Sequence, residues 1–273
     1  MVTHEKRQKL LVGVDEAGYG PNLGPFVIGG SAWIVPEELD EAIFINLLDQ
    51  EQFQCRSFST GCSHVPIGDS KKLYRSGDTL QSLEIGLLSL VESLGNSASS
   101  VAQLVDLLCG NGVFPSQPPW YSDLGSLPVP FDEQLKPEIK RLSQQASQRL
   151  DKHGIRLVAV SSRVVAEPEF NRQVEKLGSK GLLLSRATFE LISKLLSSAP
   201  ELPAEIFCDR QGGRTNYLPL LMDWKPDDWF IELERTKLRC SYRSSGDSSY
   251  TIHFTIGGDN FAPTALASMA AKY

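Results

Sequence analysis

Residues 13–26 read GVDEAGYGPNLGPF and place two acids between an apolar run and a turn rich in glycine and proline. The apolar run, LLV at 10–12, predicts a strand that enters a core. Asp15 and Glu16 end this strand side by side, where their like charges repel each other. The pattern is typical either of a solvent-exposed hairpin tip or of a site that holds a positively charged group.

The composition is that of a globular protein. The chain has 273 residues, of which 41% are hydrophobic and 22% charged, and it is long enough to bury a core. Its net charge of −6 argues against nucleic-acid binding through bulk positive charge alone, but not against a locally basic groove around an acidic centre. The five cysteines never form a CxxC pair, which argues against a zinc knuckle and predicts a cytoplasmic protein. No apolar run approaches the length of a membrane span, so we expect no membrane partner. We also expect the protein to be a monomer.

Periodicity and turn signals predict one α/β domain over residues 1–273, built on a mixed sheet that helices cover. The first two strands are joined by a short turn, which favours an antiparallel pair. The predicted strands span 10–15, 25–35, 155–165, 204–209, 229–243 and 249–259. The predicted helices span 37–50, 80–94 and 182–196, and a last helix has Asn260 as its cap and Pro263 in its first turn.

Residues 95–150 interrupt this regular pattern. They are rich first in loop-forming residues and then in polar helix formers, EQLKPEIKRLSQQASQRLDKHG. Because they offer too few apolar residues for a core of their own, we interpret them as an insertion or an inserted flap and not as a separate domain.

Three predicted strands end on an acid, at Asp15, Asp209 and Asp259, and Glu16 follows the first. Ligands of α/β sheets bind outside the carboxyl ends of the strands, and neighbouring strands lie about 4.8 Å apart, so these acids would come close together. Such a cluster is unfavourable unless a cation compensates it, and hard divalent ions such as Mg²⁺ or Mn²⁺ prefer oxygen ligands. Two such ions about 3.5–4 Å apart activate a water and stabilise the leaving oxygen at a phosphodiester. The alternative is structural, since aspartate at a strand end also forms turns and caps, and Asp259 could simply start the last helix.

Four motifs of the sequence resemble signatures of the type 2 ribonuclease H family (RNase HII-like). They are DEAGYGPNLGPFVIGG at 15–30, DSKKL at 69–73, FCDRQGG at 207–213 and GGDNFAPTALASMAAK at 257–272. The first, second and fourth are specific together, whereas the third is weak alone. The resemblance covers most of the chain and leaves three stretches that look like insertions into a smaller family core, at about 36–65, 95–150 and 214–245.

The resemblance implies a ribonuclease H-like fold, which is a mixed five-stranded sheet with an antiparallel second strand, flanked by helices, here with extra strands and an inserted flap. It implies a metal-dependent endoribonuclease that uses two divalent cations, Mg²⁺ or Mn²⁺. Its substrate would be the RNA strand of RNA–DNA hybrids, or ribonucleotides embedded in duplex DNA, cut to 5′-phosphate and 3′-hydroxyl ends. The family's catalytic and metal-binding carboxylates correspond to Asp15, Glu16, Asp209 and Asp259. The resemblance also implies further C-terminal helices, which we would expect beyond Tyr273, the last residue of this sequence.

The substrate-binding residues that the resemblance implies are Gly18, Tyr19, Gly20, Lys71 and Lys72. The family has an arginine where this chain has Tyr19, and a tyrosine stacks or donates one hydrogen bond but makes no charged, bidentate contact. The alternative for Tyr19 is a surface aromatic packed on the hairpin. The alternative for the lysine pair is solvation, although cations at a helix start oppose the helix dipole and a bound phosphate would explain them.

Two further functions stay open. The chain could be a catalytically weak or non-catalytic nucleic-acid-binding relative, or a nuclease with altered substrate specificity. All four acids are present, which argues against the first alternative, whereas Tyr19 and the insertions favour the second.

Overall fold

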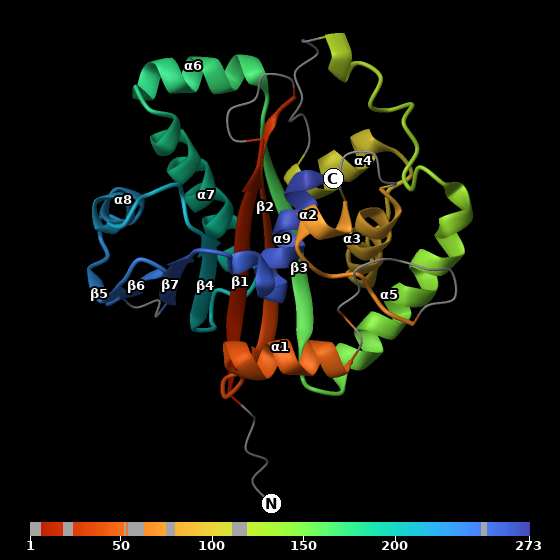
Figure 1. The fold of residues 1–273 in the computed structure, drawn as a ribbon, viewed down its shortest axis with the longest axis horizontal. Coiled ribbons are helices and arrows are strands. Elements are labelled where there is room, and N and C mark those ends of the chain that lie inside the picture. Colours follow the sequence, from red (N-terminus) through yellow and green to blue (C-terminus); the bar gives the residue numbers. More distant parts are fainter. Residues whose placement is uncertain are drawn as a thin grey trace, which may run out of the picture.

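The computed structural model describes residues 7–18, 24–51, 53, 63–74, 80–110, 119–246 and 250–273. Within these residues a seven-stranded mixed sheet runs through the molecule, in the strand order β3-β2-β1-β4-β7-β6-β5 (Figure 1). Its strands are β1 (Gln8–Ala17), β2 (Phe26–Pro36), β3 (Arg156–Val165), β4 (Ala204–Asp209), β5 (Phe230–Arg235), β6 (Arg239–Ser244) and β7 (Tyr250–Thr255).

The directions of the strands confirm the predicted fold class. Strand β2 is antiparallel to both β1 and β3, whereas β4 is parallel to β1 and β7 is parallel to β4. These five adjacent strands form the mixed sheet with an antiparallel second strand that the sequence predicts. Strands β6 and β5 extend this sheet by two antiparallel strands.

The prediction of one strand over 229–243 is wrong, because this segment forms the separate strands β5 and β6. A tight turn divides them, in which Thr236 Oγ1 accepts hydrogen bonds from the backbone amides of Leu238 and Arg239 at 3.3 and 2.9 Å. The turn contains neither glycine nor proline, so the usual turn signals do not mark it.

The helices cover both faces of the sheet (Figure 1). They are α1 (Glu41–Gln50), α2 (Ser70–Leu73), α3 (Gln81–Ser93), α4 (Val101–Cys109), α5 (Lys136–Asp151), α6 (Glu167–Leu177), α7 (Lys180–Leu196), α8 (Leu218–Trp224) and α9 (Ala262–Lys272). The described residues also include the short 3-10 turns η1 (Pro119–Tyr121), η2 (Glu133–Leu135) and η3 (Gly258–Asn260), and η3 joins β7 to α9. None of the helices in these described ranges is long and apolar enough to cross a membrane.

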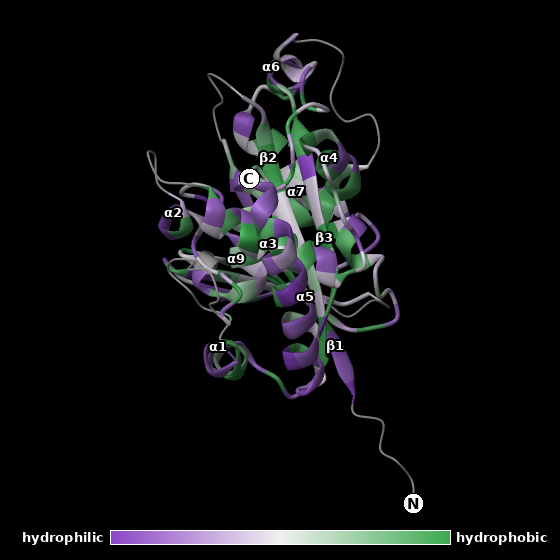
Figure 2. Cartoon of the chain, turned by 90° about the vertical axis from the view of Figure 1, so that its right-hand side faces the viewer, coloured by the Kyte–Doolittle hydropathy of each residue, from purple (hydrophilic) through white to green (hydrophobic). Residues whose placement is uncertain are grey.

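Alternating side chains of the strands divide the interior into two cores. Leu11 of β1 belongs to the core that α1, α3, α4, α5 and α9 cover, whereas Leu10 and Val12 belong to the core that α6, α7 and α8 cover. Figure 2 shows hydrophobic strands enclosed by helices whose outer faces, such as that of α5, are hydrophilic. Helix α5 is therefore held by its one apolar face and not by overall hydrophobicity.

Helix α9 packs directly on the backbone of the first two strands. A Cβ atom at Gly13 of β1 or at Gly29 of β2 would lie less than 3.0 Å from backbone atoms of α9, so only glycine fits at these positions. At the start of α9, the carbonyl of Pro263 accepts a hydrogen bond from Ser31 Oγ at 2.7 Å. Gly29 of the first motif and the small residues of the fourth motif thus form the two sides of one close contact.

The described parts of 95–150 are packed on the sheet and do not form a detached flap. Leu104 and Leu108 of α4 and Leu142 of α5 are buried in the same core as the sheet. The described part of this segment shares the core of the sheet, and its origin as an insertion stays a prediction. The sequence prediction underestimated the segment because a few apolar residues at helical spacing are enough to join an existing core.

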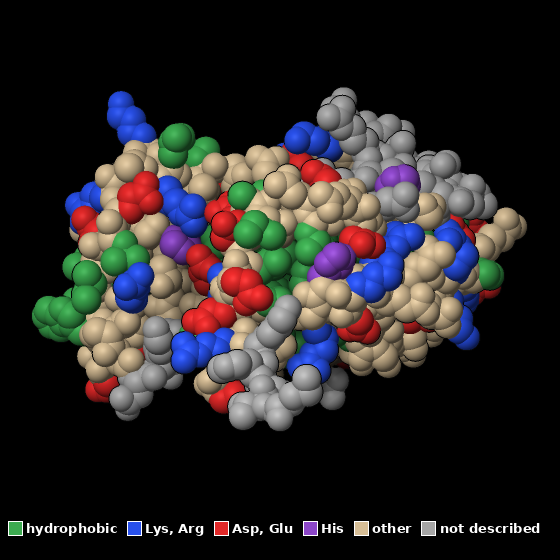
Figure 3. Space-filling model, turned by 90° about the horizontal axis from the view of Figure 1, so that it is seen from below, with side chains coloured by type: hydrophobic (Ala, Val, Ile, Leu, Met, Phe, Trp, Pro, Cys, Tyr) green, Lys and Arg blue, Asp and Glu red, His purple; other side chains and the backbone are tan. Residues whose placement is uncertain are grey.

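Strand β5 forms one edge of the sheet, at the left of Figures 1 and 3. Ile231 is 50% exposed there, and Trp229 and Leu238 are each 67% exposed. Figure 3 shows hydrophobic side chains gathered at this end of the molecule. The register of β5 against β6 shifts between Glu232 and Glu234, and such an irregularity, together with charge, discourages pairing with a further strand.

Candidate active site

Two of the predicted acids leave the sheet side by side at the carboxyl ends of parallel strands. Val14 of β1 is in register with Cys208 of β4, so the next residues along the two strands are Asp15 and Asp209. Neighbouring strands lie about 4.8 Å apart, which brings these two carboxylates to one place. Glu16 follows, and its backbone amide donates a hydrogen bond to Asp15 Oδ1 at 2.8 Å.

The electrostatics of this cluster show that its charges repel each other. Burial, followed by the negative charges of Asp15 and Asp209, raises the pKa of Glu16 from 4.5 to about 8, although the positive charge of Lys71 acts in the opposite direction. Burial, and then the nearby acids, also raises the pKa of the Cys208 thiol well above its ordinary value, so this cysteine is an inert residue beneath the cluster. The acids therefore lie close enough to interact.

Asp259 lies beyond a strand and not at its end. Strand β7 stops at Thr255, and the chain then turns through Gly257, whose φ of 71° is left-handed, into η3. The prediction of a strand up to 259 is thus wrong. A Cβ atom at Gly258 would lie 3.8 Å from the Cα atom of Asp209, so the backbone of η3 lies against the end of β4. The side chain of Asp259 falls outside the described part of the structure.

Asn260 is not the cap of the last helix, contrary to the sequence prediction. The N-cap of α9 is Phe261, which makes no side-chain capping hydrogen bond, and Pro263 stands in the first turn as predicted. Asn260 Nδ2 instead donates to the carbonyl of Gly257 at 3.2 Å. The amide is used to close the turn that carries Asp259, so it is not available to the helix.

The DSKKL motif forms the short helix α2 and is tied to the end of α9. Asp69 caps α2 by accepting a hydrogen bond from the Lys71 amide at 2.9 Å, and Lys71 and Lys72 are exposed. Lys272 Nζ of α9 donates to the carbonyls of Ser70 and Tyr74, at 3.3 and 3.2 Å. In addition, Ser70 Oγ and Ser268 Oγ lie 2.9 Å apart. These contacts hold Lys71 where its charge reaches Glu16.

The described end of the predicted recognition turn is tightly packed. Gly18 has a left-handed φ of 75°, and a Cβ atom there would lie 2.7 Å from the carbonyl oxygen of Pro25. Glycine is required at this position on both grounds. Tyr19 and Gly20 lie outside the described residues, so the hypotheses about them stay predictions.

The structure also gives contacts to two residues, Arg210 and Glu167, that the predicted set of site residues does not include. Arg210, which follows Asp209, is nearly buried, and its guanidinium donates hydrogen bonds to the carbonyls of Arg214 and Lys237. It therefore holds the loop after β4 in place. The carboxylate of Glu167 accepts hydrogen bonds from the Gly24 amide at 2.9 Å and from the Tyr121 hydroxyl at 2.6 Å. Glu167 and Gly24 are 143 positions apart, and no local pattern could have revealed their contact.

The donor chemistry at this end of the sheet fits a hard divalent cation. Asp15, Glu16 and Asp209 offer only oxygen ligands, and a cation among them would relieve the repulsion that raises the pKa of Glu16. Among the side chains that the structure describes, no group of three or more His, Cys, Asp or Glu residues is close enough to hold a metal ion. The side chain of Asp259 is not among them, so ligation by all four acids stays a prediction.

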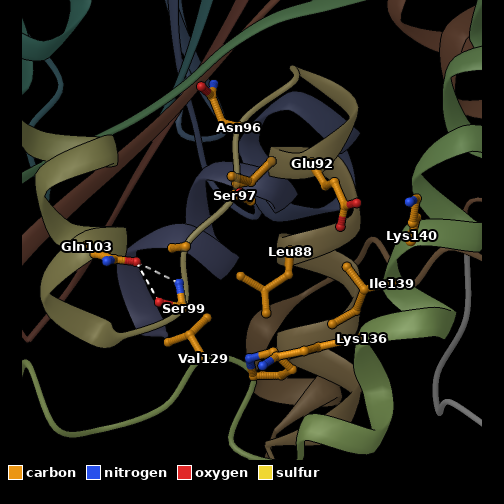
Figure 4. Close-up of a pocket in the computed structure, with 13 residues that line it drawn as sticks. Leu88, Glu92, Asn96, Ser97, Ser99, Gln103, Val129, Lys136, Ile139 and Lys140 are labelled. Atoms are coloured by element: carbon orange, nitrogen blue, oxygen red, sulfur yellow. Dashed lines mark hydrogen bonds between the residues drawn. The ribbon is translucent and has the colours of Figure 1, made fainter.

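A separate hollow lies between α3, α4 and α5 (Figure 4). It has a volume of about 380 Å³ and an apolar wall that includes Leu88 and Ile139. Lys136 and Lys140 project over it, and Lys136 is paired with Glu133 at 2.6 Å. None of the four predicted acids lines this hollow, which therefore does not belong to the candidate site.

The fold and the site together define a mixed α/β protein with acids clustered at the carboxyl ends of two parallel strands. No protein-family model and no curated protein sequence match the chain. Among solved structures, it is similar to Bst-RNase HIII in complex with Mn²⁺, with a TM-score of 0.45, 14% identity, and coverage of 99% of this chain and 53% of that one. A mutant of Bst-RNase HIII gives a TM-score of 0.44, 15% identity and the same coverages, 99% and 53%. This chain thus spans about half the length of these structures.

Proposed function

We propose that this protein is a metal-dependent endoribonuclease that cleaves the RNA strand of RNA–DNA hybrids, or duplex DNA at embedded ribonucleotides, and leaves 5′-phosphate and 3′-hydroxyl ends. The parallel pairing of β1 and β4 carries the proposal, because it brings Asp15, Glu16 and Asp209 to one end of the sheet. The same acids stand in motifs that resemble those of type 2 ribonucleases H, and the strand directions agree with that resemblance.

The four predicted acids would hold two divalent cations, Mg²⁺ or Mn²⁺. Bound there, the cations would supply the activation of the attacking water and the stabilisation of the leaving oxygen. The other residues of the site position the substrate. The backbone at Gly18, which Pro25 packs against, would face the sugar, and the exposed Lys71 and Lys72 would attract backbone phosphates.

A nuclease with altered specificity is the second candidate, and one observation favours it. Tyr19 replaces the arginine that the family uses near the ribonucleotide, whose 2′-hydroxyl distinguishes RNA from DNA. A tyrosine cannot make the charged, bidentate contact of an arginine. Cleavage would then be retained while the choice between a continuous RNA strand and a single ribonucleotide changes.

The test is a cleavage assay with Mg²⁺ or Mn²⁺ and three labelled duplexes, which carry a full RNA strand, one ribonucleotide or DNA only. We expect cuts at RNA that Asp15→Asn and Asp209→Asn reduce by more than about a hundredfold, as expected for loss of a metal ligand. Asp227→Asn is the matched control, since Asp227 is an exposed aspartate in the turn before β5. It should leave the rate unchanged.

The duplexes also separate the alternatives. Equal cutting of the all-DNA duplex would refute the ribonuclease assignment. Binding of the hybrid without any cutting, with both metals tested, would support a non-catalytic binding protein instead. A preference for only one of the two RNA-containing duplexes would fix the substrate within the proposed class.

A further inference from the structure

The carboxylate of Glu167 joins two segments that are far apart in the sequence. Its Oε1 atom accepts a hydrogen bond from the backbone amide of Gly24 at 2.9 Å, and its Oε2 atom accepts one from the Tyr121 hydroxyl at 2.6 Å. Gly24 is the first residue that the structure describes after the predicted recognition turn, and it lies just before β2. Tyr121 ends η1, within the segment 95–150 that the sequence left without a role.

The position of Glu167 suits a fixed anion. It is the first residue of α6, where the helix dipole favours a negative charge, and α6 begins beside the upper ends of β1, β2 and β3 (Figure 1). Hydrogen bonds to a carboxylate are shorter and stronger than those between neutral groups, in agreement with the 2.6 Å to Tyr121. The acid therefore binds both donors firmly.

The segment that carries Tyr121 is itself anchored to the body of the protein. The amides of Ala102 and Val101 in α4 donate to the carbonyls of Leu124 and Leu127, at 3.2 and 3.0 Å. Helix α4 is in turn fixed to the sheet, because the carbonyl at its buried Leu108 accepts a 2.7 Å hydrogen bond from Ser161 of β3. A continuous set of bonded elements thus leads from the sheet to Glu167.

The other end of the link reaches the proposed site. Pro25 follows Gly24, and its carbonyl oxygen lies so near Gly18 that a Cβ atom there would be only 2.7 Å away. Gly18 lies only two positions after Glu16 and three after Asp15. A shift of Gly24 therefore moves Pro25 against Gly18, at the point where we expect the substrate backbone to approach.

We infer that Glu167 and Tyr121 are positioning residues that fix the chain at Gly24 and Pro25, and through it Gly18, for the nucleic-acid backbone. The inference rests on the proposed function and assigns segment 95–150 a role in substrate engagement. Neither residue touches the reacting phosphate in this role. They fix the position of the protein backbone at Gly18, which faces the substrate.

The experiment measures two quantities, the amide hydrogen exchange of Gly24 by NMR and the kinetics on the hybrid duplex. The variants are Glu167→Ala, which removes both acceptors, and Tyr121→Phe, which removes one hydroxyl and leaves the packing of the ring. Glu175→Gln is the control, because Glu175 is an exposed acid on the same helix. Glu167→Gln tests rescue, since its amide oxygen can still accept the Gly24 hydrogen bond.

We expect Gly24 to exchange about tenfold faster in Glu167→Ala, as loss of one hydrogen bond predicts, and KM to rise about three- to tenfold while kcat stays within about twofold. Tyr121→Phe should show smaller changes in the same directions, and Glu167→Gln should restore most of the exchange protection. The control should match the wild type. If Glu167→Ala does not fold, Tyr121→Phe carries the test alone.

The hydrogen-exchange and kinetic measurements test separate steps of the inference. Unchanged exchange at Gly24 in both variants overturns the inference whatever the enzyme does. Faster exchange with unchanged KM shows a structural bond without a positioning role and also overturns it. If the wild type binds the hybrid but does not cut it, the proposed catalysis fails alone, and the dissociation constant of the hybrid replaces KM in the same comparison.

Discussion

Replacing Glu16 by glutamine should stabilise the metal-free protein at alkaline pH. Burial and the charges of Asp15 and Asp209 raise the pKa of this carboxyl group from 4.5 to about 8. Between these values the folded state holds a proton on Glu16 that the unfolded chain releases, so the free energy of unfolding falls as the pH rises through about 8. Glutamine resembles the protonated side chain and removes this loss.

The pKa shift of Glu16 also sets the size of the expected gain in the free energy of unfolding. Each pKa unit corresponds to about 1.4 kcal/mol, so a rise from 4.5 to about 8 corresponds to at most about 5 kcal/mol above pH 8. Glu16 keeps part of its surface in contact with solvent, which screens part of the repulsion, so we expect a difference of about 2 kcal/mol.

The assay is urea unfolding in EDTA at about pH 5 and pH 9. Glu16→Gln should equal the wild type within about 0.5 kcal/mol at the lower pH and exceed it by about 2 kcal/mol at the higher pH. Glu37→Gln, a change at an exposed acid in the turn after β2, is the control and should give no such difference. A variant that is less stable than the wild type at pH 9 would refute the electrostatic reasoning, because the site would then not be strained by its own charge.

Two predictions concern the stability of the frame that holds the site. The imidazole of His253, 3.4 Å from Glu205, lowers the pKa of that carboxylate to about 2. The carboxylate therefore stabilises the fold above pH 4.5, and this stabilisation is lost as the pH falls toward 2. In urea unfolding, Glu205→Gln should lower the free energy of unfolding by about 1 kcal/mol at pH 7, after solvent screening, and should have no effect near pH 2. Gly29→Ala should lower the free energy of unfolding by about 3 kcal/mol in thermal or urea unfolding, because the added Cβ would overlap the carbonyl of Ala267. Gly125→Ala is the control, since a Cβ there would have no atom within 4 Å, and it should change this free energy by less than about 0.5 kcal/mol.

The mixed α/β class and the placing of Asp15 and Asp209 at strand ends could be predicted from the sequence, because both depend on local signals. An apolar run that ends on Asp15, and another that ends on Asp209, each mark the carboxyl end of a strand, and parallel pairing does the rest. The contact of Glu167 with Gly24 depends on the path of the whole chain, which no spacing encodes. The same holds for Arg210, whose guanidinium binds the backbone carbonyls of Arg214 and Lys237.

Helix α9 connects the frame of the sheet to both sides of the proposed site. Its backbone is pressed onto Gly29, the turn just before it carries Asp259, and its last residues hold α2 through Lys272. The small residues of the last motif are therefore explained by packing, and the acid that precedes them is the part of the motif left for chemistry. A substitution that lifts α9 from the sheet would move Asp259 and Lys71 together relative to Asp15. Under the proposed function, such a change would impair the binding of the metal and of the phosphate together, although it alters no residue proposed to contact them.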